Sequence, residues 1–476
     1  MALRAPVPLV RAAVPLLAAL ASITLLALPA AAAPKAAKAP KAAPVKAQKA
    51  PPFQAFPFPV EVKTLKNGLR IALVPYDSPG LVAYYTVMRV GSRNEAEKGR
   101  SGYAHFFEHM MFRGTKAHSG DDYNSTVTRL GLNTNAFTDY DHTVYHLYGP
   151  TRSLPVIVEY EADRFKNLDY KLEQFKTEAG SILGEYAKSA SSPEQLLQEK
   201  IQETAFDKHT YRHTVIGYLA DIKAMPDGFD YAHDFFKRYY TPDNATIVVA
   251  GDFDREKTLA LLEKHYGDWT GKLKAQPIAV EGPQKKARRA HVEWEQPTLQ
   301  RTFVGWHVPG AADLKGAAAI QVLGAYLFGA TSPLYQDLVL TRQLVDGLEA
   351  QAQVQRDPTL LGVLARVKKD EDSPAVEKAI GASITELAKG KVDAQRLAGV
   401  VSNARYTAGL ALDKADSVAV TLALNSALTG DLNYQNKLYA QLEKLTSAEL
   451  VAFARRWLVE SNKVTVTLAA KKEAGK

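Results

Sequence analysis

The sequence of 476 residues contains no cysteine. Disulfide bonds are therefore excluded, and so is a lipid anchor on an N-terminal cysteine, because both need a cysteine sulfur. Stability must come from core packing or from a bound metal ion. At this length, with 46% hydrophobic and 23% charged residues, the chain has the composition of a globular protein of two or more domains.

Net charge is scarce once the N-terminal segment is set aside. The formal charge is +8, but two arginines and five lysines among residues 1–50 supply seven of these charges. Removing them leaves +1 for residues 51–476. A nearly neutral body offers no extended basic surface, so we exclude nucleic-acid binding.

The first 33 residues have the layout of a secretory signal peptide. Arg4 and Arg11 precede an apolar run from about residue 13 to 28, and Pro29 and four alanines follow it. A retained membrane anchor is the alternative, because the run is close to the shortest length that spans a bilayer. The small residues favour cleavage, which predicts an exported chain, periplasmic or secreted, that no membrane holds afterwards.

Two segments lack the apolar residues that a core requires. Residues 34–55 begin with a stretch of almost only Ala, Pro and Lys, which predicts a flexible tether. Residues 276–290 are basic and polar, which predicts an interdomain linker. The two domains defined in this way comprise residues 56–275 and 291–472.

The two halves share a short repeat. Arg238-Tyr239 is followed by Asn244, and Arg456-Trp457 is followed by Asn462, at a constant offset of 218 residues. This offset predicts two domains of one fold, with chance similarity as the alternative. Strand-like segments alternate with helical stretches such as residues 172–189, which favours an α+β fold with helices packed on a mostly antiparallel sheet in each domain.

A cluster of metal-binding residue types lies between residues 104 and 112. His105 and His109 are four residues apart, so they share one face of a helix with Glu108. Catalytic zinc takes such imidazole ligands and keeps a position open for water, and a neighbouring acid that does not bind the metal can accept a proton from this water. The alternative is a core helix with chance spacing, which would bury these polar groups without partners.

A third ligand must come from elsewhere in the chain. The helical stretch at residues 171–189 offers Glu173, Glu178 and Glu185. Glu178 and Glu185 are seven residues apart, so both face one way. Spacing alone does not decide between them.

These motifs resemble the pitrilysin/insulysin family of inverzincin zinc metallopeptidases, above all the two-domain branch that includes the mitochondrial processing peptidase. In that family the ligating glutamate follows H-x-x-E-H at the spacing found here, with 75 residues between His109 and Glu185. The resemblance implies one zinc per chain, bound by His105, His109 and Glu185, with Glu108 as general base. Glu178 matches a family glutamate that supports the site without binding the metal. Further matching segments are Asn67-Gly68-Leu69, Val90-Gly91-Ser92, Asn135-Ala136-Phe137-Thr138, Pro242-Asp243-Asn244 and Gly251-Asp252.

The resemblance also assigns a place to the substrate. Asn135, Ala136 and Phe137 would lie on an edge strand that receives the backbone of a peptide or unfolded polypeptide, with an ordinary edge strand as the alternative. Residues 211–213, Tyr-Arg-His, match a further family signature for which we expect a structural role. The two domains would form half of a clamshell.

One expected feature is missing. Amide hydrolysis requires stabilisation of the developing oxyanion, and the family uses an Arg and a Tyr of the second domain for this. This sequence has Val339 and Asp346 at the matching positions. The resemblance therefore implies a heterodimer with a homologous chain that lacks the metal motif but supplies the pair. The alternative is a homodimer in which Tyr335 or Arg342 replaces it.

The sequence thus predicts a zinc-dependent endopeptidase subunit. A non-catalytic scaffold is one alternative, as in the core subunits of the respiratory cytochrome bc complex, which resemble the family but have degraded metal sites. The complete set of metal-site residues argues against it. A peptide-binding module with structural zinc is the other, but it would need a fourth protein ligand, and the sequence shows none.

Overall fold

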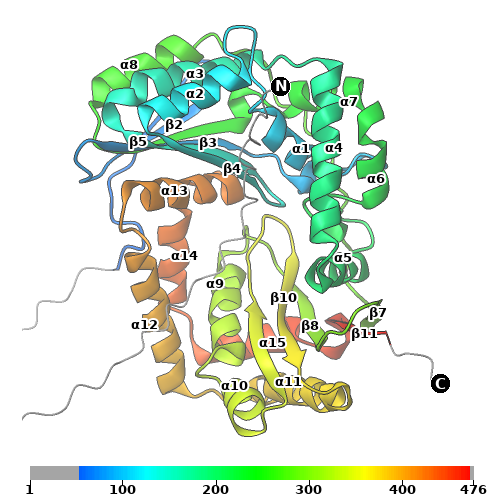
Figure 1. The fold of residues 1–476 in the computed structure, drawn as a ribbon. Helices are drawn as coiled ribbons and strands as arrows, with labels where there is room; N and C mark the ends of the chain where they lie inside the picture. The colour runs from blue at the N-terminus through cyan, green and yellow to red at the C-terminus, as the bar shows by residue number, and fades with distance from the viewer. Residues whose placement is uncertain (1–52, 472–476) are drawn as a thin grey trace, which may run out of the picture. The chain divides into compact units, whose positions relative to one another are not determined.

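The computed structural model describes residues 53–471 and contains two sheets, each covered by helices (Figure 1). The expected signal peptide and most of the expected tether lie outside the described residues. The first sheet has the strand order β1-β2-β6-β3-β5-β4, in which only β2 and β6 are parallel. Its strands are β1 (Glu61–Thr64), β2 (Arg70–Pro75), β3 (Leu81–Met88), β4 (Asn133–Thr138), β5 (Thr143–Pro150) and β6 (Ala245–Gly251).

The second sheet has the order β7-β11-β8-β10-β9, in which only β7 and β11 are parallel. It therefore repeats the first sheet without β1, and β9 occupies the edge position that β4 has in the first sheet. The strands are β7 (Arg288–Trp294), β8 (Gln300–Val308), β9 (Val345–Gln351), β10 (Thr359–Val367) and β11 (Lys463–Ala470).

The repeat predicted from the sequence corresponds to equivalent positions in the two sheets. Asn244 donates to the carbonyl of Tyr239 at 2.9 Å immediately before β6, and Asn462 donates to the carbonyl of Trp457 at 2.7 Å immediately before β11. Each asparagine thus ties the end of a helix to the start of the strand that enters the middle of its sheet. The predicted α+β class, with two similar mostly antiparallel sheets, is confirmed.

Helices pack on the sheets because their apolar faces supply most of the buried side chains. The helices that precede β7 in the chain are α1 (Tyr103–Met110), α2 (Gly120–Leu130), α3 (Leu154–Asn167), α4 (Leu172–Ser189), α5 (Pro193–Ala205), α6 (Leu219–Ala224), α7 (Phe229–Tyr239) and α8 (Arg255–Tyr266). Those that follow β8 are α9 (Leu314–Leu323), α10 (Pro333–Tyr335), α11 (Ser373–Ala388), α12 (Ala394–Leu410), α13 (Ala415–Thr429), α14 (Tyr434–Leu442) and α15 (Ser447–Trp457).

Two helices cross over between the sheets. Val418 and Leu422 of α13 pack against the first sheet, and Leu197 and Ile201 of α5 pack against the second. This exchange buries the second face of each sheet, and residues 54–471 form one compact unit. The domain boundaries at 276–290 therefore stay a prediction.

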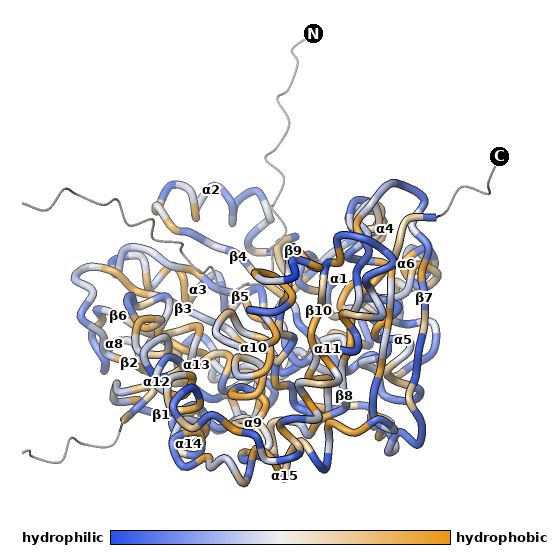
Figure 2. Tube along the Cα trace, turned by 90° about the horizontal axis from the view of Figure 1, so that it is seen from below, coloured by the Kyte–Doolittle hydropathy of each residue, from blue (hydrophilic) through white to orange (hydrophobic). Residues whose placement is uncertain are grey.

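One apolar helical run extends from Leu314 to Thr341. Among residues 53–471, only Leu314–Thr341 is long and apolar enough to cross a membrane, with a mean hydropathy of 1.3. This run belongs to the hydrophobic core that packs on the second sheet. Of its most apolar 18-residue stretch, 67% is buried inside the protein. Figure 2 shows its apolar residues among those of the neighbouring elements. It is a core segment of this part of the fold, made of α9, α10 and the two π-helical stretches that follow them.

Candidate metal centre

Helix α1 has two chemically different faces. It begins after Gly102, whose φ of 93° is a conformation that glycine adopts without strain. With the apolar face in the core, His105, Glu108 and His109 are left on the other side of the helix, towards α4 and β4. The buried residues are Tyr103, Ala104, Phe106, Phe107 and Met110.

Helix α4 brings Glu185 to both histidines. Glu185 Oε2 lies 3.7 Å from Nε2 of His105 and 3.5 Å from Nε2 of His109, and one ligand atom of each residue lies within 4.8 Å of the others. Zinc with ligand distances of about 2.0–2.1 Å in tetrahedral geometry separates its ligand atoms by about 3.4 Å. Two imidazoles and one carboxylate at these separations fit a zinc ion with one open position.

Glu178 holds the ring of His109. The Nδ1 atom of His109 donates to Glu178 Oε1 at 2.8 Å, which leaves Nε2 directed towards Glu185. Arg113, just after α1, forms an ion pair with the other oxygen of Glu178, whose side chain is only 2% exposed. Such a carboxylate fixes the tautomer and orientation of a ligating imidazole.

The two histidines have different electrostatic surroundings. Burial and, to a smaller extent, the charge of the neighbouring His109 together lower the pKa of His105 to about 3. Burial also acts to lower the pKa of His109, but its hydrogen bond and charge interaction with Glu178 raise it above the usual value. A neutral imidazole is the form that binds a metal, and His105 is held in that form.

Glu108 points to the end of the edge strand β4. The hydroxyl of Thr138, the last residue of β4, donates to Glu108 Oε2 at 2.6 Å. Burial raises the pKa of Glu108, and the hydrogen bond from Thr138 offsets part of that effect. The base candidate and the end of the predicted substrate strand are therefore in direct contact.

The predicted substrate residues lie on β4, which pairs only with β5 among the described strands. Ala136 is 2% exposed and belongs to the core, whereas Asn135 and Phe137 are partly exposed. The Asn135 side chain accepts from the main-chain N–H of Ala136 at 2.9 Å. One backbone edge of β4 is thus open for another strand, but side-chain binding by these residues stays a prediction.

Sequence reasoning missed the residue that holds the start of α1. The carboxylate of Glu95 is buried and accepts from the main-chain N–H groups of Gly102 and Ala104, both at 2.7 Å. It therefore satisfies two of the donors that a helix leaves free at its N-terminus. Burial raises the pKa of Glu95 to about 8, although these hydrogen bonds act to lower it.

The Tyr-Arg-His segment is not part of the metal centre. Tyr211 is 2% exposed and donates to Asp141 at 2.7 Å, in the turn after β4. The Nδ1 atom of His213 donates to the carbonyl of Thr214 at 2.9 Å, and Nε2 lies 3.8 Å from Glu95. These contacts agree with the structural role that we expected.

The residues around the missing Arg and Tyr are engaged locally. Val339 packs against the core, and Asp346 of β9 accepts from Arg366 at 2.6 Å. Arg342 forms an ion pair with Asp337 on the turn before it.

The segment before Arg342 is a π-helix. It comprises residues 336–341, and the N–H of Arg342 bonds to the carbonyl of Asp337 at 2.8 Å. This i→i+5 bonding places the residues at other angles around the axis than an α-helix does.

We predict that Glu178→Gln weakens zinc binding by about 10–100-fold, because the amide loses the charge that orients His109. Glu185→Gln should weaken it as well, because a ligand is lost. Glu173→Gln is the matched control, since Glu173 is exposed at the start of the same helix. Competition titration with a chelator measures all three, and equal affinities of the Glu178 and Glu173 variants would contradict the assignment.

Two family profiles match the chain. The profile described as "Insulinase (Peptidase family M16)" matches residues 79–218, and the profile "Peptidase M16 inactive domain" matches residues 229–403. The first includes His105, Glu108, His109 and Glu185, so the whole candidate metal centre lies in the insulinase-type part.

Named relatives agree with these profiles. Zinc protease PqqE of Helicobacter pylori is 28% identical over 419 residues, which cover 86% of this chain and 92% of PqqE. The beta subunit of the mouse (Mus musculus) mitochondrial-processing peptidase is 30% identical over 210 residues, covering 44% of this chain and 42% of that subunit. Both of these relatives are named as a protease or as a subunit of a peptidase.

Solved structures show the same fold. A protease from Helicobacter pylori has a TM-score of 0.81 at 28% identity, covering 86% of this chain and 99% of that chain. The periplasmic protease PqqL from Escherichia coli has a TM-score of 0.71 at 19% identity, covering 89% of this chain but only 48% of PqqL. The fold described above thus matches the whole chain of the Helicobacter pylori protease but only about half of the PqqL chain.

Proposed function

Because the chain belongs to the M16 peptidase family, we propose that it is the zinc-binding half of an endopeptidase that cleaves peptides or unfolded polypeptides. The convergence of His105, His109 and Glu185 on one point carries this proposal. Glu108 lies on the same face of α1 as the two histidines, and its carboxylate is not needed as a metal ligand.

The chain's own residues divide the reaction among them. A zinc ion bound by the three ligands would polarise the substrate carbonyl and lower the pKa of a water molecule at the open position. Thr138 holds Oε2 of Glu108, so Oε1 is left to accept the proton of the attacking water. Glu108 can then pass this proton to the leaving amine.

The edge strand β4 positions the peptide. An extended substrate that adds to β4 would make main-chain hydrogen bonds, which tolerate many sequences. Since Thr138 ends β4 and contacts Glu108, such a peptide passes beside the base. Substrate binding by Asn135, Ala136 and Phe137 follows from this arrangement.

We propose that a homologous partner chain completes the site. Val339 and Asp346 cannot act as the oxyanion donors, and Arg342 is paired with Asp337. The chain spans about half of PqqL, and a peptidase named as a subunit is among its relatives. These comparisons support a homologous partner. That this partner lacks the metal motif but carries the Arg and Tyr is our proposal from Val339 and Asp346.

The place of action that we propose is the periplasm or the exterior. The layout of residues 1–33 motivates this, and PqqL is described as periplasmic. A scaffold without activity remains the opposing function, but its metal residues would have no reason to keep the mutual spacing observed for His105, His109 and Glu185.

The test is a titration of peptidase activity against added partner at fixed zinc. We expect the chain alone to be nearly inactive and activity to saturate at one partner per chain, because an oxyanion donor contributes about 10²–10³-fold. Full activity of the isolated chain that is lost in Arg342→Ala would contradict the heterodimer and favour a homodimer.

A further inference from the structure

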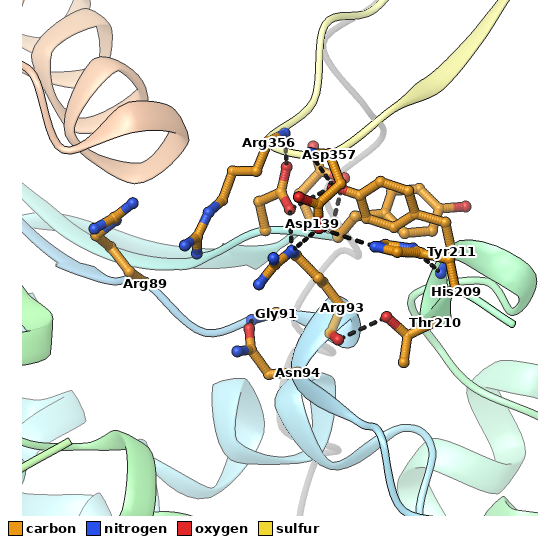
Figure 3. A network of polar contacts seen from close by, with 12 residues as sticks. Arg89, Gly91, Arg93, Asn94, Asp139, His209, Thr210, Tyr211, Arg356 and Asp357 are labelled. Carbon is orange, nitrogen blue, oxygen red and sulfur yellow. Dashed lines mark hydrogen bonds and ion pairs between the residues drawn. The ribbon is translucent and has the colours of Figure 1, made fainter. Parts of the chain in front are cut away.

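The loop between β9 and β10 reaches the turn that follows the substrate strand β4 (Figure 3). The main-chain N–H of Arg356 donates to Asp141 at 2.8 Å, and Gln353 donates to Asp139 at 3.3 Å. This loop is the counterpart, in the second sheet, of the β4–β5 turn that it contacts. A residue of the second sheet is therefore fixed at the Thr138 end of β4.

The backbone at Arg356 is held from both sides. Its neighbour Asp357 accepts from Arg93 at 2.5 Å and from His209 at 2.9 Å. The main-chain N–H of Asp357 donates to the hydroxyl of Tyr211 at 3.3 Å. Figure 3 shows these groups converging on the loop from separate elements of the first part of the chain.

The guanidinium of Arg356 is left without a partner. It makes no hydrogen bond or ion pair with any residue between 53 and 471, and Figure 3 shows it extended towards Arg89. Asp141 already accepts from Tyr211 and from the Arg356 main chain, and Asp357 is occupied by Arg93 and His209. The carboxylates of this network are thus engaged by other groups.

Arg89 places a second positive charge beside it. Its Nε donates to the carbonyl of Ala427 at 3.2 Å, near the end of α13, which leaves its terminal nitrogens available. Burial, followed by the charge of Arg356, lowers the pKa of Arg89 to about 10. Burial and the charge of Arg93 lower the pKa of Arg356, although the charges of Asp141 and Asp357 act to raise it. Two partly buried cations that repel one another are costly unless an anion joins them.

His142 adds an unused polar side chain at this place. It is 8% exposed, and neither ring nitrogen has a hydrogen-bond partner in the described part of the chain. It follows Asp141 directly. Burial lowers the pKa of His142, although the charges of Asp139 and Asp141 act to raise it. A neutral imidazole retains one N–H that can donate to an anion.

At the Thr138 end of β4, the arginines and the metal centre lie on opposite faces of the first sheet. Thr138 of β4 faces α1 and Glu108, whereas Phe137 faces the side of the sheet that α13 covers. Arg89 contacts α13 and therefore lies on this second side. Since side chains of a strand alternate, a peptide along β4 would direct neighbouring residues to the metal and to the arginines in turn.

We propose that Arg356 and Arg89 bind a carboxylate of the peptide substrate, either an Asp or Glu side chain or the free C-terminus. The proposal rests on the proposed function, because the peptide has to lie along β4. A guanidinium is suited to this task, since its planar donors match a carboxylate. The chain would then favour acidic peptides over neutral ones of equal length.

The experiment uses the zinc-loaded Glu108→Gln chain with its partner, so that bound peptide is not consumed. Synthetic nonapeptide pools with either Asp and Glu or Asn and Gln, each with free or amidated C-termini, separate the two sources of the carboxylate. We expect binding about tenfold tighter for the pools that carry the recognised carboxylate. Arg356→Gln should abolish this preference, and Arg356→Lys should keep part of it because the charge remains.

Arg366→Gln is the matched control, because Arg366 lies on the neighbouring β10 and pairs with Asp346 at the surface. It should keep the full preference. A chain that binds all pools equally, or an Arg356→Gln variant with unchanged preference, would overturn the anion site and leave the proposed function intact. Failure of the zinc-loaded chain to bind any pool would overturn both.

Discussion

The His105→Ala and His109→Ala variants are expected to contain no zinc after dialysis, whereas the unaltered chain contains one zinc per chain. Each variant loses one of three ligands whose atoms lie within 4.8 Å of one another. Two remaining ligands cannot provide the three protein contacts that catalytic zinc sites use. Metal analysis by mass spectrometry, at known protein concentration, measures the result.

His118→Ala is the control for this prediction. His118 lies soon after α1 but interacts with Asp122 at 3.1 Å and stacks on Tyr160, so its loss should leave zinc content unchanged. Circular dichroism of all variants shows whether the fold is kept. Equal zinc content in the His105 variant, the His118 variant and the unaltered chain would remove the metal assignment.

Glu108→Gln is expected to retain zinc and to lose about 10²–10⁴-fold in turnover. The amide has nearly the same shape and can still accept a hydrogen bond from Thr138, but it cannot accept the proton of water. Since Glu108 is not among the three ligands, the metal should stay bound. Single-turnover cleavage of an unfolded peptide, with zinc content measured on the same sample, separates the two effects.

Glu185→Gln provides the contrasting pattern, because its loss of activity should be restored in part by excess zinc. The Glu108→Gln loss should not respond to zinc at all. Recovery of the Glu108 variant on addition of zinc, or activity close to that of the unaltered chain, would place the base at another residue.

Local patterns in the sequence predicted the elements that carry the metal centre. The helical stretch at 172–189 coincides with α4, and Asn67-Gly68, a pair typical of tight turns, joins β1 to β2. These predictions succeed because helix periodicity and turn residues act over a few neighbouring positions. The structure brings His105, His109 and Glu185 together, as the resemblance implied, although their role as ligands stays a prediction.

Contacts between distant segments could not be predicted in this way. Glu95 binds main-chain groups at the start of α1, and nothing in its own sequence neighbourhood marks it as a helix cap. Arg356 meets Asp141 across 215 residues, through a pairing of equivalent loops that only the folded chain creates. The π-helix before Arg342 likewise depends on how the segment packs, so residue spacing alone does not predict it.

The most direct measurement is peptide cleavage by the metal-free chain, with its partner present, as zinc is added back in small steps. The account predicts no cleavage without metal, a linear rise with added zinc, and saturation at one zinc per chain. The His105→Ala variant should give no cleavage at any point of the titration. Cleavage that is independent of zinc, or an inert chain that nevertheless binds one zinc at His105, His109 and Glu185 and has its partner, would contradict the assignment as a zinc endopeptidase.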